Sequence, residues 1–481
     1  MSQINETAIR TPGVYTTEIP TLPPSVAQVS TAVPAFIGYT QRALNELGDS
    51  LVNIPTKIFS LKEYEQYFGF AENETGITVN VNITTNPVTA AVISMSAQAQ
   101  IAGPSLHNMH HCLRLYFENG GGPCYIVSVG PTVSPAVLNP VNLQAGLTAL
   151  EAWDEPTLIV FPEGQGLAEA AYYGLIGQAI DQCALLQDRF AFVDVHTQAP
   201  TTTGSINNFR NNLPHTTGFG KSDNLNYAVA YYPNLRTTFN YNYVDSAVDV
   251  LITTDGVPAG AAVGLDTLQT TQTAVFNLCV DRIRTQISPT LPPSAAMAGI
   301  YAKVDGTRGV WKAPANVSVN SVFETTDFIT DAEQGDMNMD PGSGKSVNAI
   351  RSFNGKGILV WGARTLDGNS NEWRYVSVRR LFIMVEESAK KATFQFVFEP
   401  NDANTWVKVR AMLENYLTLL WRQGALAGAK PEHAFFVKCG LGSTMSAQDI
   451  LEGRLIVEIG MAAVRPAEFI ILRFMHKLQE S

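Results

Sequence analysis

Short apolar runs recur through the first half of the chain, separated by polar or amphipathic stretches. The runs occupy residues 35–39, 124–129, 157–161, 190–195 and 228–232. Each run is apolar almost throughout, which is typical of strands that are buried on both faces of a sheet. Residues 167–187 lie between two of these runs and have the length and pattern of a helix. A strand, a helix and a strand at this spacing indicate a parallel βαβ unit, so we expect an α/β layered domain.

The N-terminal segment is predicted to be an extended arm. Prolines at positions 12, 20, 23, 24 and 34 exclude a helix from residues 11–34. Between these prolines lies a strand candidate without a neighbouring strand, formed by Val14, Tyr15, Thr16, Thr17, Glu18 and Ile19. A lone strand satisfies its backbone groups by joining another sheet. We therefore assign residues 1–27 to an arm, with a disordered terminus as the alternative.

A turn-rich stretch, PGSGK at residues 341–345, predicts a domain boundary. Residues 28–345 then form a middle or outer α/β domain, with a variable insertion near residues 71–104 that is rich in Asn, Thr, Val, Ser and Ala. Residues 346–481 form an inner α+β domain with a C-terminal arm. The charge also changes at this boundary, from a net −15 over residues 1–345 to a net +4 over residues 346–481. The second part can therefore face an acidic partner, unless the asymmetry is chance.

The inner domain is predicted to combine two helices with short strands. Apolar residues at helical spacing between Val378 and Ala389 predict one helix, and a second is expected over residues 405–423. Strands are expected at residues 357–362, 434–438, 454–459 and 469–475. The last of these lies close to the C-terminus and can leave its own body to pair elsewhere. It begins with Phe469, Ile470, Ile471, Leu472 and Arg473.

The helix expected at residues 405–423 has two different faces. Its apolar stripe consists of Trp406, Val409, Leu413, Tyr416, Leu417 and Leu420. The opposite face carries Lys408 and Arg422 among small or polar residues. Such a helix can pack on its own domain through the stripe and contact a partner through the other face. A plain solvated face is the alternative.

Composition narrows the classes of function. Charged residues make up 16% of the 481 residues and the net charge is −11, which disfavours generic nucleic-acid binding. No apolar run approaches the roughly 18 residues of a membrane span. The five cysteines are widely spaced and form no CxxC pair, which indicates free, mostly buried thiols in a reducing compartment. Because residues 1–10 lack the pattern of a signal peptide, we expect folding and assembly in a cytoplasm.

No motif for catalysis or for cofactor binding is complete. The sequence DPGSGKS at residues 340–346 is close to a phosphate-binding loop, but that loop requires a glycine where this chain has Met339. His107, His110 and His111 lack further ligands at zinc spacing, and no GxSxG nucleophile elbow occurs. We therefore predict no catalytic residue, no cofactor and no metal. An α/β-class enzyme that uses the middle domain is the alternative.

Several stretches resemble the tail sheath proteins of contractile phage tails and of related extracellular contractile injection systems. TPGVYTTEI at residues 11–19 and TAVPAFIGYT at residues 31–40 look like the opening of that family. Further similar blocks follow in the family's order, namely PPSAAMAGIYAKVDGTRGVWKAPAN (292–316), GILVWGART (357–365), YVSVRRLFIMVEES (375–388), FEPND (398–402) and AFFVKC (434–439). Residues 70–291 match only in their coarse pattern of strands and helices.

The resemblance implies a structural subunit and not an enzyme. Such subunits form stacked six-fold rings around an inner tube, together with baseplate and terminal cap proteins, and the sheath contracts to drive the tube through a target envelope. Terminal arms would add strands to neighbouring subunits, so exchanged strands at residues 14–19 and 469–473 would complete the inner α+β domain. We further expect Lys408 and Arg422 to face the tube. The particle would assemble in a bacterial cytoplasm as a phage tail or as a released phage-tail-like particle, without nucleic acid or membrane insertion.

Overall fold

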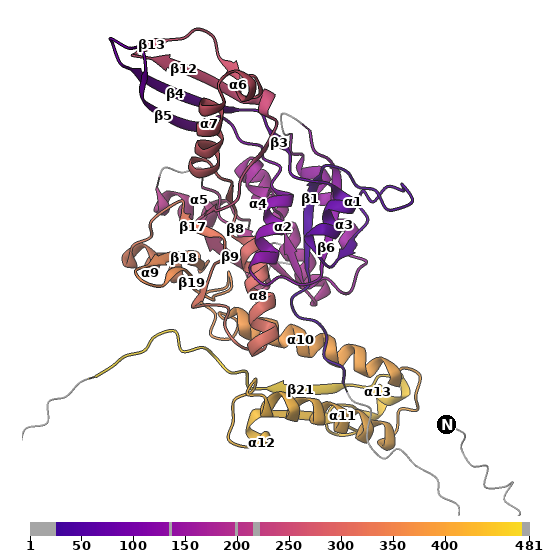
Figure 1. Ribbon diagram of the computed structural model, residues 1–481. Coiled ribbons are helices and arrows are strands. Elements are labelled where there is room, and N and C mark those ends of the chain that lie inside the picture. The colour runs from indigo at the N-terminus through magenta and orange to yellow at the C-terminus, as the bar shows by residue number, and fades with distance from the viewer. Residues whose placement is uncertain (1–25, 134–136, 198–200, 215–221, 474–481) are drawn as a thin grey trace, which may run out of the picture. The chain divides into compact units, whose positions relative to one another are not determined.

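The computed structural model describes residues 26–133, 137–197, 201–214 and 222–473 (Figure 1). The chain divides into two compact units, each assembled from separate parts of the sequence. The large unit contains residues 30–384 and 465–481, and the small unit contains residues 1–29 and 385–464. The predicted arm strand at residues 14–19 lies outside the described residues.

The large unit is built around a mixed sheet of nine strands. The six strands from β18 to β6 run parallel to their neighbours, whereas β19, β16 and β2 add antiparallel pairs at the two edges. From edge to edge the strands are β16 (Val317–Ser318), β19 (Gly357–Trp361), β18 (Val347–Phe353), β9 (Ala228–Tyr232), β8 (Phe190–Asp194), β7 (Leu158–Val160), β1 (Pro34–Thr40), β6 (Cys124–Pro131) and β2 (Thr56–Ile58).

The five apolar runs of the sequence form five of the six parallel strands. Their residues are buried almost without exception, as expected for strands covered on both faces. The predicted helix between two of them is α4 (Glu169–Leu186), which packs on β8. The expectation of an α/β layered body is therefore confirmed. All five cysteines are free and buried, also as predicted.

Helices cover both faces of this sheet, as the contacts of β1 show. Successive side chains of β1 point to opposite faces of the sheet. The ring of Phe36 lies 5.2 Å from that of Tyr116 on α2. Ile37 points to α3 instead, where a Cβ on Gly146 would lie only 2.7 Å from its Cγ2 atom. In turn α2 packs against α8, and α3 packs against α4. The bounds of these helices are α2 (Met109–Glu118), α3 (Pro140–Leu150) and α8 (Ser294–Arg308).

The division of the chain differs from the boundary expected at Lys345. Strands β18 and β19 follow that residue, yet they extend the nine-stranded sheet of the large unit. In β18, Val347 and Ala349 are buried and pair in register with Ala230 and Tyr232 of β9. The compact units separate between Met384 and Val385 instead. The correction arises because the turn at residues 341–345 reverses the chain without ending the sheet.

A second sheet in the large unit has its own small core. It combines the predicted insertion, which forms β4 (Ile77–Thr85) and β5 (Val92–Ile101), with the distant strand β12 (Asp249–Thr254). Helices α6 (Leu265–Thr271) and α7 (Thr273–Gln286) complete it. The core residues include Ile77, Val79, Val81, Val248, Val250, Leu265, Leu268, Cys279 and Ile283.

Several shorter elements complete the large unit. They are α1 (Leu61–Phe68), β3 (Asn73–Glu74), α5 (Thr202–Asn212), β10 (Leu235–Thr237), β11 (Asn242–Tyr243), β13 (Val257–Pro258), β14 (Val263–Gly264), β15 (Thr290–Leu291), β17 (Val322–Thr325) and α9 (Asp331–Asn338). Within the described residues, we find no helix with the length and apolar character needed to cross a bilayer.

The small unit consists of helices around a two-stranded antiparallel sheet. Strands β20 (Phe435–Cys439) and β21 (Val457–Met461) pair along their whole length, and α11 (Ala403–Arg422) packs on β20. The second segment of this unit begins in the C-terminal part of α10 (Val376–Thr393) and also contains α12 (Pro431–Ala434) and α13 (Ala447–Leu451). The N-terminal segment joins it where the backbone N–H of Val29 donates to Ser388 Oγ at 3.1 Å.

Candidate assembly interface

The carboxyl ends of the parallel strands, where α/β proteins commonly bind ligands, are filled by buried polar side chains. Glu163 follows β7 and accepts a hydrogen bond from the backbone N–H of Tyr39 at 2.9 Å. Its other oxygen lies 3.2 Å from His107 Nδ1, while His107 Nε2 accepts from the N–H of Val133 at 3.3 Å. His107 therefore donates from Nδ1, and burial raises the pKa of Glu163 although these bonds lower it. This edge of the sheet is occupied by the subunit's own groups.

The lysine of the incomplete phosphate-loop motif is also committed to the fold. Lys345 is fully buried, and its Nζ donates to the carbonyl oxygens of Arg210 and Leu213, both at 2.8 Å. Burial lowers the pKa of Lys345 to about 8, although nearby Asp340 acts in the opposite direction. The ammonium group therefore stabilises the end of α5 and points away from any loop that would hold a phosphate.

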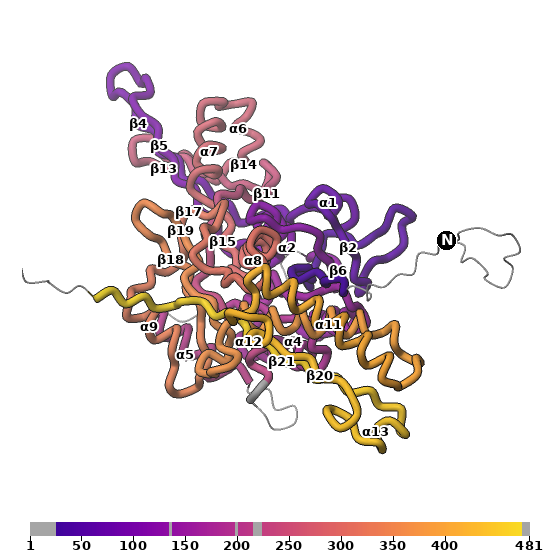
Figure 2. Tube along the Cα trace, turned by 90° about the horizontal axis from the view of Figure 1, so that it is seen from below, coloured from indigo at the N-terminus to yellow at the C-terminus, as the bar shows by residue number. Residues whose placement is uncertain are grey.

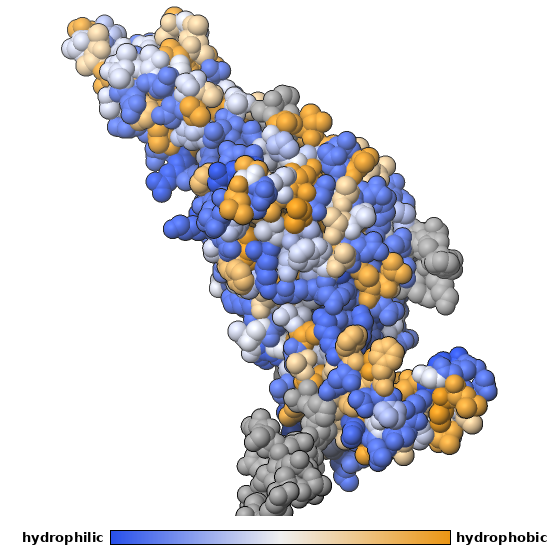
Figure 3. Space-filling model, turned by 90° about the vertical axis from the view of Figure 1, so that its right-hand side faces the viewer, coloured by the Kyte–Doolittle hydropathy of each residue, from blue (hydrophilic) through white to orange (hydrophobic). Residues whose placement is uncertain are grey.

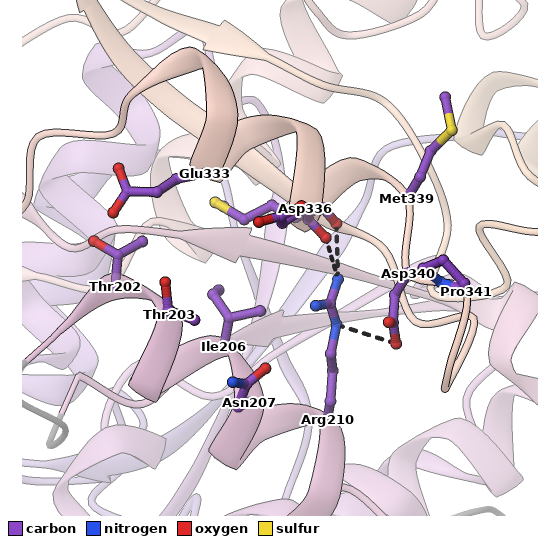
Figure 4. A pocket seen from close by; sticks show the side chains of 11 residues that line it. Thr202, Thr203, Ile206, Asn207, Arg210, Glu333, Asp336, Met339, Asp340 and Pro341 are labelled. Carbon is purple, nitrogen blue, oxygen red and sulfur yellow. Dashed lines mark hydrogen bonds and ion pairs between the residues drawn. The ribbon is translucent and has the colours of Figure 1, made fainter.

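A cavity of about 190 Å³ lies between α5 and α9 (Figure 4). Arg210 extends into it and donates to the carbonyl oxygen of Asp336 at 2.7 Å. Its Nε also lies 3.5 Å from the Asp340 carboxylate. The guanidinium in this cavity is thus bound by acceptors of the subunit itself, and it links α5 to α9.

The three histidines of the HxxHH motif are held by different partners. His107 pairs with Glu163, and His110 Nε2 lies 3.0 Å from Glu65. His111 is buried and its ring lies against Tyr241, and burial lowers the pKa of His111 to about 3. Over the described residues, no group of three His, Cys, Asp or Glu side chains is arranged to hold a metal ion.

The small unit presents a sheet that can accept further strands. In the described part of the chain, β20 and β21 form a sheet of two, and no third strand pairs with either of them. Unpaired edges of a sheet are templates for a strand from another chain. The two edges of this sheet are therefore candidate assembly sites.

The C-terminal segment is apolar, and its described part, up to residue 473, forms no strand within its own subunit. Figure 2 shows it as a yellow trace that passes beside α9. The strand expected at residues 469–475 is absent from its described part, residues 469–473. Phe469, Ile470, Ile471 and Leu472 are 63–79% exposed. Four consecutive large apolar side chains in solvent indicate a segment that is buried by a partner.

Comparison with known proteins identifies the family. Residues 369–476 match the model of the phage tail sheath C-terminal domain. A sheath chain from PVC, an extracellular contractile injection system solved in the contracted state, is 31% identical to this chain. That alignment covers 98% of this chain and 99% of the solved chain, with a TM-score of 0.63. The chain belongs to the tail sheath family.

Other members of the sheath family agree with this assignment. The helical sheath of the anti-feeding prophage in its contracted state is also 31% identical, with a TM-score of 0.63 over 98% of this chain and all of that chain. The tail sheath protein of Vibrio phage KVP40 is 22% identical over 243 residues, half of this chain. The alignment spans only 30% of that curated relative's length. The predictions of the family and of a structural sheath protein are confirmed.

The two basic residues expected to face the tube lie where the helical pattern placed them. Lys408 and Arg422 are exposed on α11, whereas Val409, Leu413 and Leu417 are buried on the other face of the same helix. Exposed apolar residues also gather on the small unit, and exposed apolar residues are orange in Figure 3. They include Phe394, Val397, Phe398, Val407, Leu419, Phe436, Leu441 and Leu451. In a sheath protein, such surfaces are candidates for contacts between subunits.

The sequence did not predict one contact of the C-terminal segment. Glu468, just before the exposed apolar segment, pairs with Arg364, also of the large unit, at 2.6 Å. Arg364 lies in the block GILVWGART that resembles the sheath family. A single glutamate beside an apolar run has the pattern of a solvated side chain, so the sequence carries no signal for this pairing.

Proposed function

We propose that this chain is the repeating structural subunit of a contractile sheath that surrounds an inner tube and contracts to drive the tube through a target envelope. The observation that carries the proposal is the 31% identity, over 98% of the chain, to sheath chains solved in the contracted state. A similar chain comes from the six-fold symmetrised baseplate of the anti-feeding prophage. That likeness supports six-fold rings and a baseplate as a partner. Stacking of the rings around an inner tube, with a terminal cap, completes the proposed assembly.

In this proposal the subunit acts without catalysis, cofactor or metal. An extended sheath is a metastable lattice, and its conversion to a more stable contracted lattice releases the free energy that moves the tube. The subunit then has to fold, assemble and rearrange as a body. Assembly takes place in the bacterial cytoplasm, as part of a phage tail or of a released phage-tail-like particle.

The terminal arms link neighbouring subunits in the proposed sheath. Residues 14–19 and 469–473 add strands to the open edges of the β20–β21 sheet of a neighbour. Two observations support this arrangement: the sheet has only two strands in the described chain, and residues 469–472 expose large apolar side chains. Each backbone hydrogen bond between chains contributes about 0.5–1.5 kcal/mol net. Repeated in every subunit, such bonds make a continuous mesh that survives rigid-body rotation of the subunits.

Truncation of each arm tests the proposal. Deletion of residues 1–20, or of residues 469–481, should spare folding of the monomer because the described cores lie elsewhere. Either deletion should abolish sheath formation. Circular dichroism reports folding, and electron microscopy reports hollow tubes. The full chain should form tubes under the same conditions; compact particles from the full chain would contradict the sheath function, and ordered sheaths from a truncated chain would contradict arm exchange.

The exposed face of α11 is proposed to contact the inner tube. Lys408 and Arg422 are 14 positions apart, so at about 100° per residue they lie within roughly 40° of each other around the helix. The part of the chain after residue 345 carries a net charge of +4, in contrast to the acidic remainder. Basic residues on this face would complement an acidic tube and fix the register between tube and sheath.

A further inference from the structure

Each of the two segments that lead into the arms is bound by a buried arginine of the large unit. At the C-terminal segment, Arg364 binds Glu468 through two parallel bonds, Nε to Oε1 at 3.0 Å and Nη2 to Oε2 at 2.6 Å. The side chain of Arg364 is 3% exposed and that of Glu468 is 21% exposed. Two parallel bonds between a guanidinium and a carboxylate fix orientation as well as distance.

Other groups of the large unit complete the binding site of the Glu468 carboxylate. Asn338, at the end of α9, donates to Oε1 at 2.7 Å, and the hydroxyl of Tyr375 donates to Oε2 at 3.2 Å. Arg364 also donates to the carbonyl oxygen of Gly368 at 3.1 Å. Burial acts to raise the pKa of Glu468, but the bonds from Arg364, Asn338 and Tyr375 hold it below its usual value. This binding site therefore favours the ionised form of the Glu468 carboxylate.

The N-terminal segment has a matching anchor at Thr31. Arg380 donates to the carbonyl oxygen of Thr31 at 2.8 Å and to the Asp305 carboxylate at 2.6 and 3.1 Å. The Thr31 hydroxyl donates to the same carboxylate at 2.6 Å. Arg380 and Asp305 are 4% and 7% exposed, and the guanidinium lies 4.6 Å from the ring centre of Tyr301. Here too a buried ion pair of the body holds the backbone of a segment that leads to a terminus.

We propose that the Arg364–Glu468 and Arg380–Asp305 pairs are arm-root anchors, which fix where each arm leaves the subunit and carry its tension into the nine-stranded sheet. The inference rests on the proposed exchange of arms. Arg364 lies three residues after β19, and Asp305 lies on α8, which packs on β7 and β8. Releasing Glu468 would leave Arg364 buried without its counter-ion, which is strongly unfavourable for a buried charge. The arms therefore bend beyond the anchors, after Glu468 and before Thr31.

The test compares Glu468→Gln and Glu468→Ala with Glu452→Gln. Gln at position 468 keeps the size of the side chain and can still accept from Arg364, so this variant folds even if the alanine variant does not. Glu452 is the matched control because it forms an exposed ion pair with Arg454. Amide hydrogen exchange of residues 467–469 reports the anchor, and electron microscopy of assembled sheaths reports their length and helical regularity.

We expect amide exchange at residues 467–469 to rise at least tenfold in Glu468→Gln and further in Glu468→Ala, with exchange in β18 unchanged. Sheaths of both variants should be short, with variable twist, while Glu452→Gln should match the parent in both measurements. Unchanged amide exchange at residues 467–469 would overturn the anchor, and so would faster exchange with sheaths of normal length and twist. Failure of the parent chain itself to form sheaths would instead contradict the proposed function.

Discussion

The carboxylate of Asp194, at the end of β8, accepts two hydrogen bonds from Ser294, 2.8 Å from its backbone nitrogen and 2.6 Å from Oγ. Ser294 is the first residue of α8, so the carboxylate lies at a helix N-terminus, where unpaired N–H groups favour negative charge. Both residues are buried. The contact joins the central sheet to the block PPSAAMAG, one of the stretches that resemble the sheath family, and it gives that block a structural role.

Replacement of Ser294 by alanine should destabilise the large unit. The substitution removes the hydroxyl donor and leaves a buried carboxylate with only the backbone N–H bond from this residue, at a cost of about 1–3 kcal/mol. Denaturant unfolding followed by circular dichroism gives the free energy of unfolding. The control is Ser96→Ala on the exposed strand β5, which should stay within about 0.5 kcal/mol of the parent. Equal stability of the two variants would contradict the role of the Asp194–Ser294 contact.

The same carboxylate should make stability depend on pH. Burial raises the pKa of Asp194 to about 7, although the bonds from Ser294 lower it. Between about pH 4 and pH 7 the folded chain then holds a proton that the unfolded chain has lost, so the free energy of unfolding falls as pH rises through this window. The slope reaches at most about 1.4 kcal/mol per pH unit.

The variant Asp194→Asn isolates this contribution. Urea unfolding of parent and variant at intervals from pH 4.5 to 7.5 should give a smaller decrease with pH in the variant. Glu163 and Glu74, whose pKa values are also raised by burial, contribute equally to both curves. Parallel curves would show that Asp194 does not carry the effect.

Close packing of α3 on the sheet predicts a contrast between two glycines. A Cβ at Gly146 would lie 2.7 Å from Ile37 and 2.7 Å from Val129, so Gly146→Ala should destabilise by about 1–3 kcal/mol. Gly174 lies in the middle of α4 with open space around it. Gly174→Ala should stabilise by about 0.5–1 kcal/mol, because alanine loses less conformational freedom in a helix. Thermal unfolding compares the two, and a shift of the same sign in both would contradict the packing argument.

Charge reversal on α11 tests the proposed tube face. The double variant Lys408→Glu and Arg422→Glu should fold normally but co-assemble with the tube poorly, with a defect that depends on salt. Arg410→Glu is the control, because Arg410 lies roughly 200° around the helix from Lys408. Sedimentation of tube and sheath together, across a range of salt concentrations, measures co-assembly. Co-assembly of the double variant at the parental level in every salt would remove this face from the tube interface.

The central strands could be predicted from the sequence because each strand is itself a short, continuous run of apolar residues. A run such as Phe190–Asp194 is apolar on both faces, and only a strand covered by helices on two sides needs that pattern. The faces of α11 were predictable for a similar reason, since its apolar stripe repeats at helical spacing. The family resemblance added the function, which the strands and helices alone do not specify.

The second sheet and the arm-root anchors depend on pairings that no local pattern shows. Val79 of β4 pairs with Val250 of β12, far along the chain, and nothing in either segment shows that the two strands join the same sheet. The misplaced boundary at Lys345 has the same origin, because a turn does not indicate which sheet the next strand joins. Glu468 looked like a surface charge, since its partner Arg364 lies about a hundred residues earlier.

The bond between Val29 and Ser388 joins positions 359 residues apart. Bacterial and other ribosomes add roughly 5–20 residues per second, so the start of the chain leaves the ribosome on the order of 20–70 s before Ser388 is made. Residues 30–384, by contrast, are contiguous and can fold as they emerge. The small unit is therefore completed late, after the contiguous part of the large unit. The sheet edges that would accept a neighbour's strands in the proposed sheath come into existence only when synthesis is nearly finished.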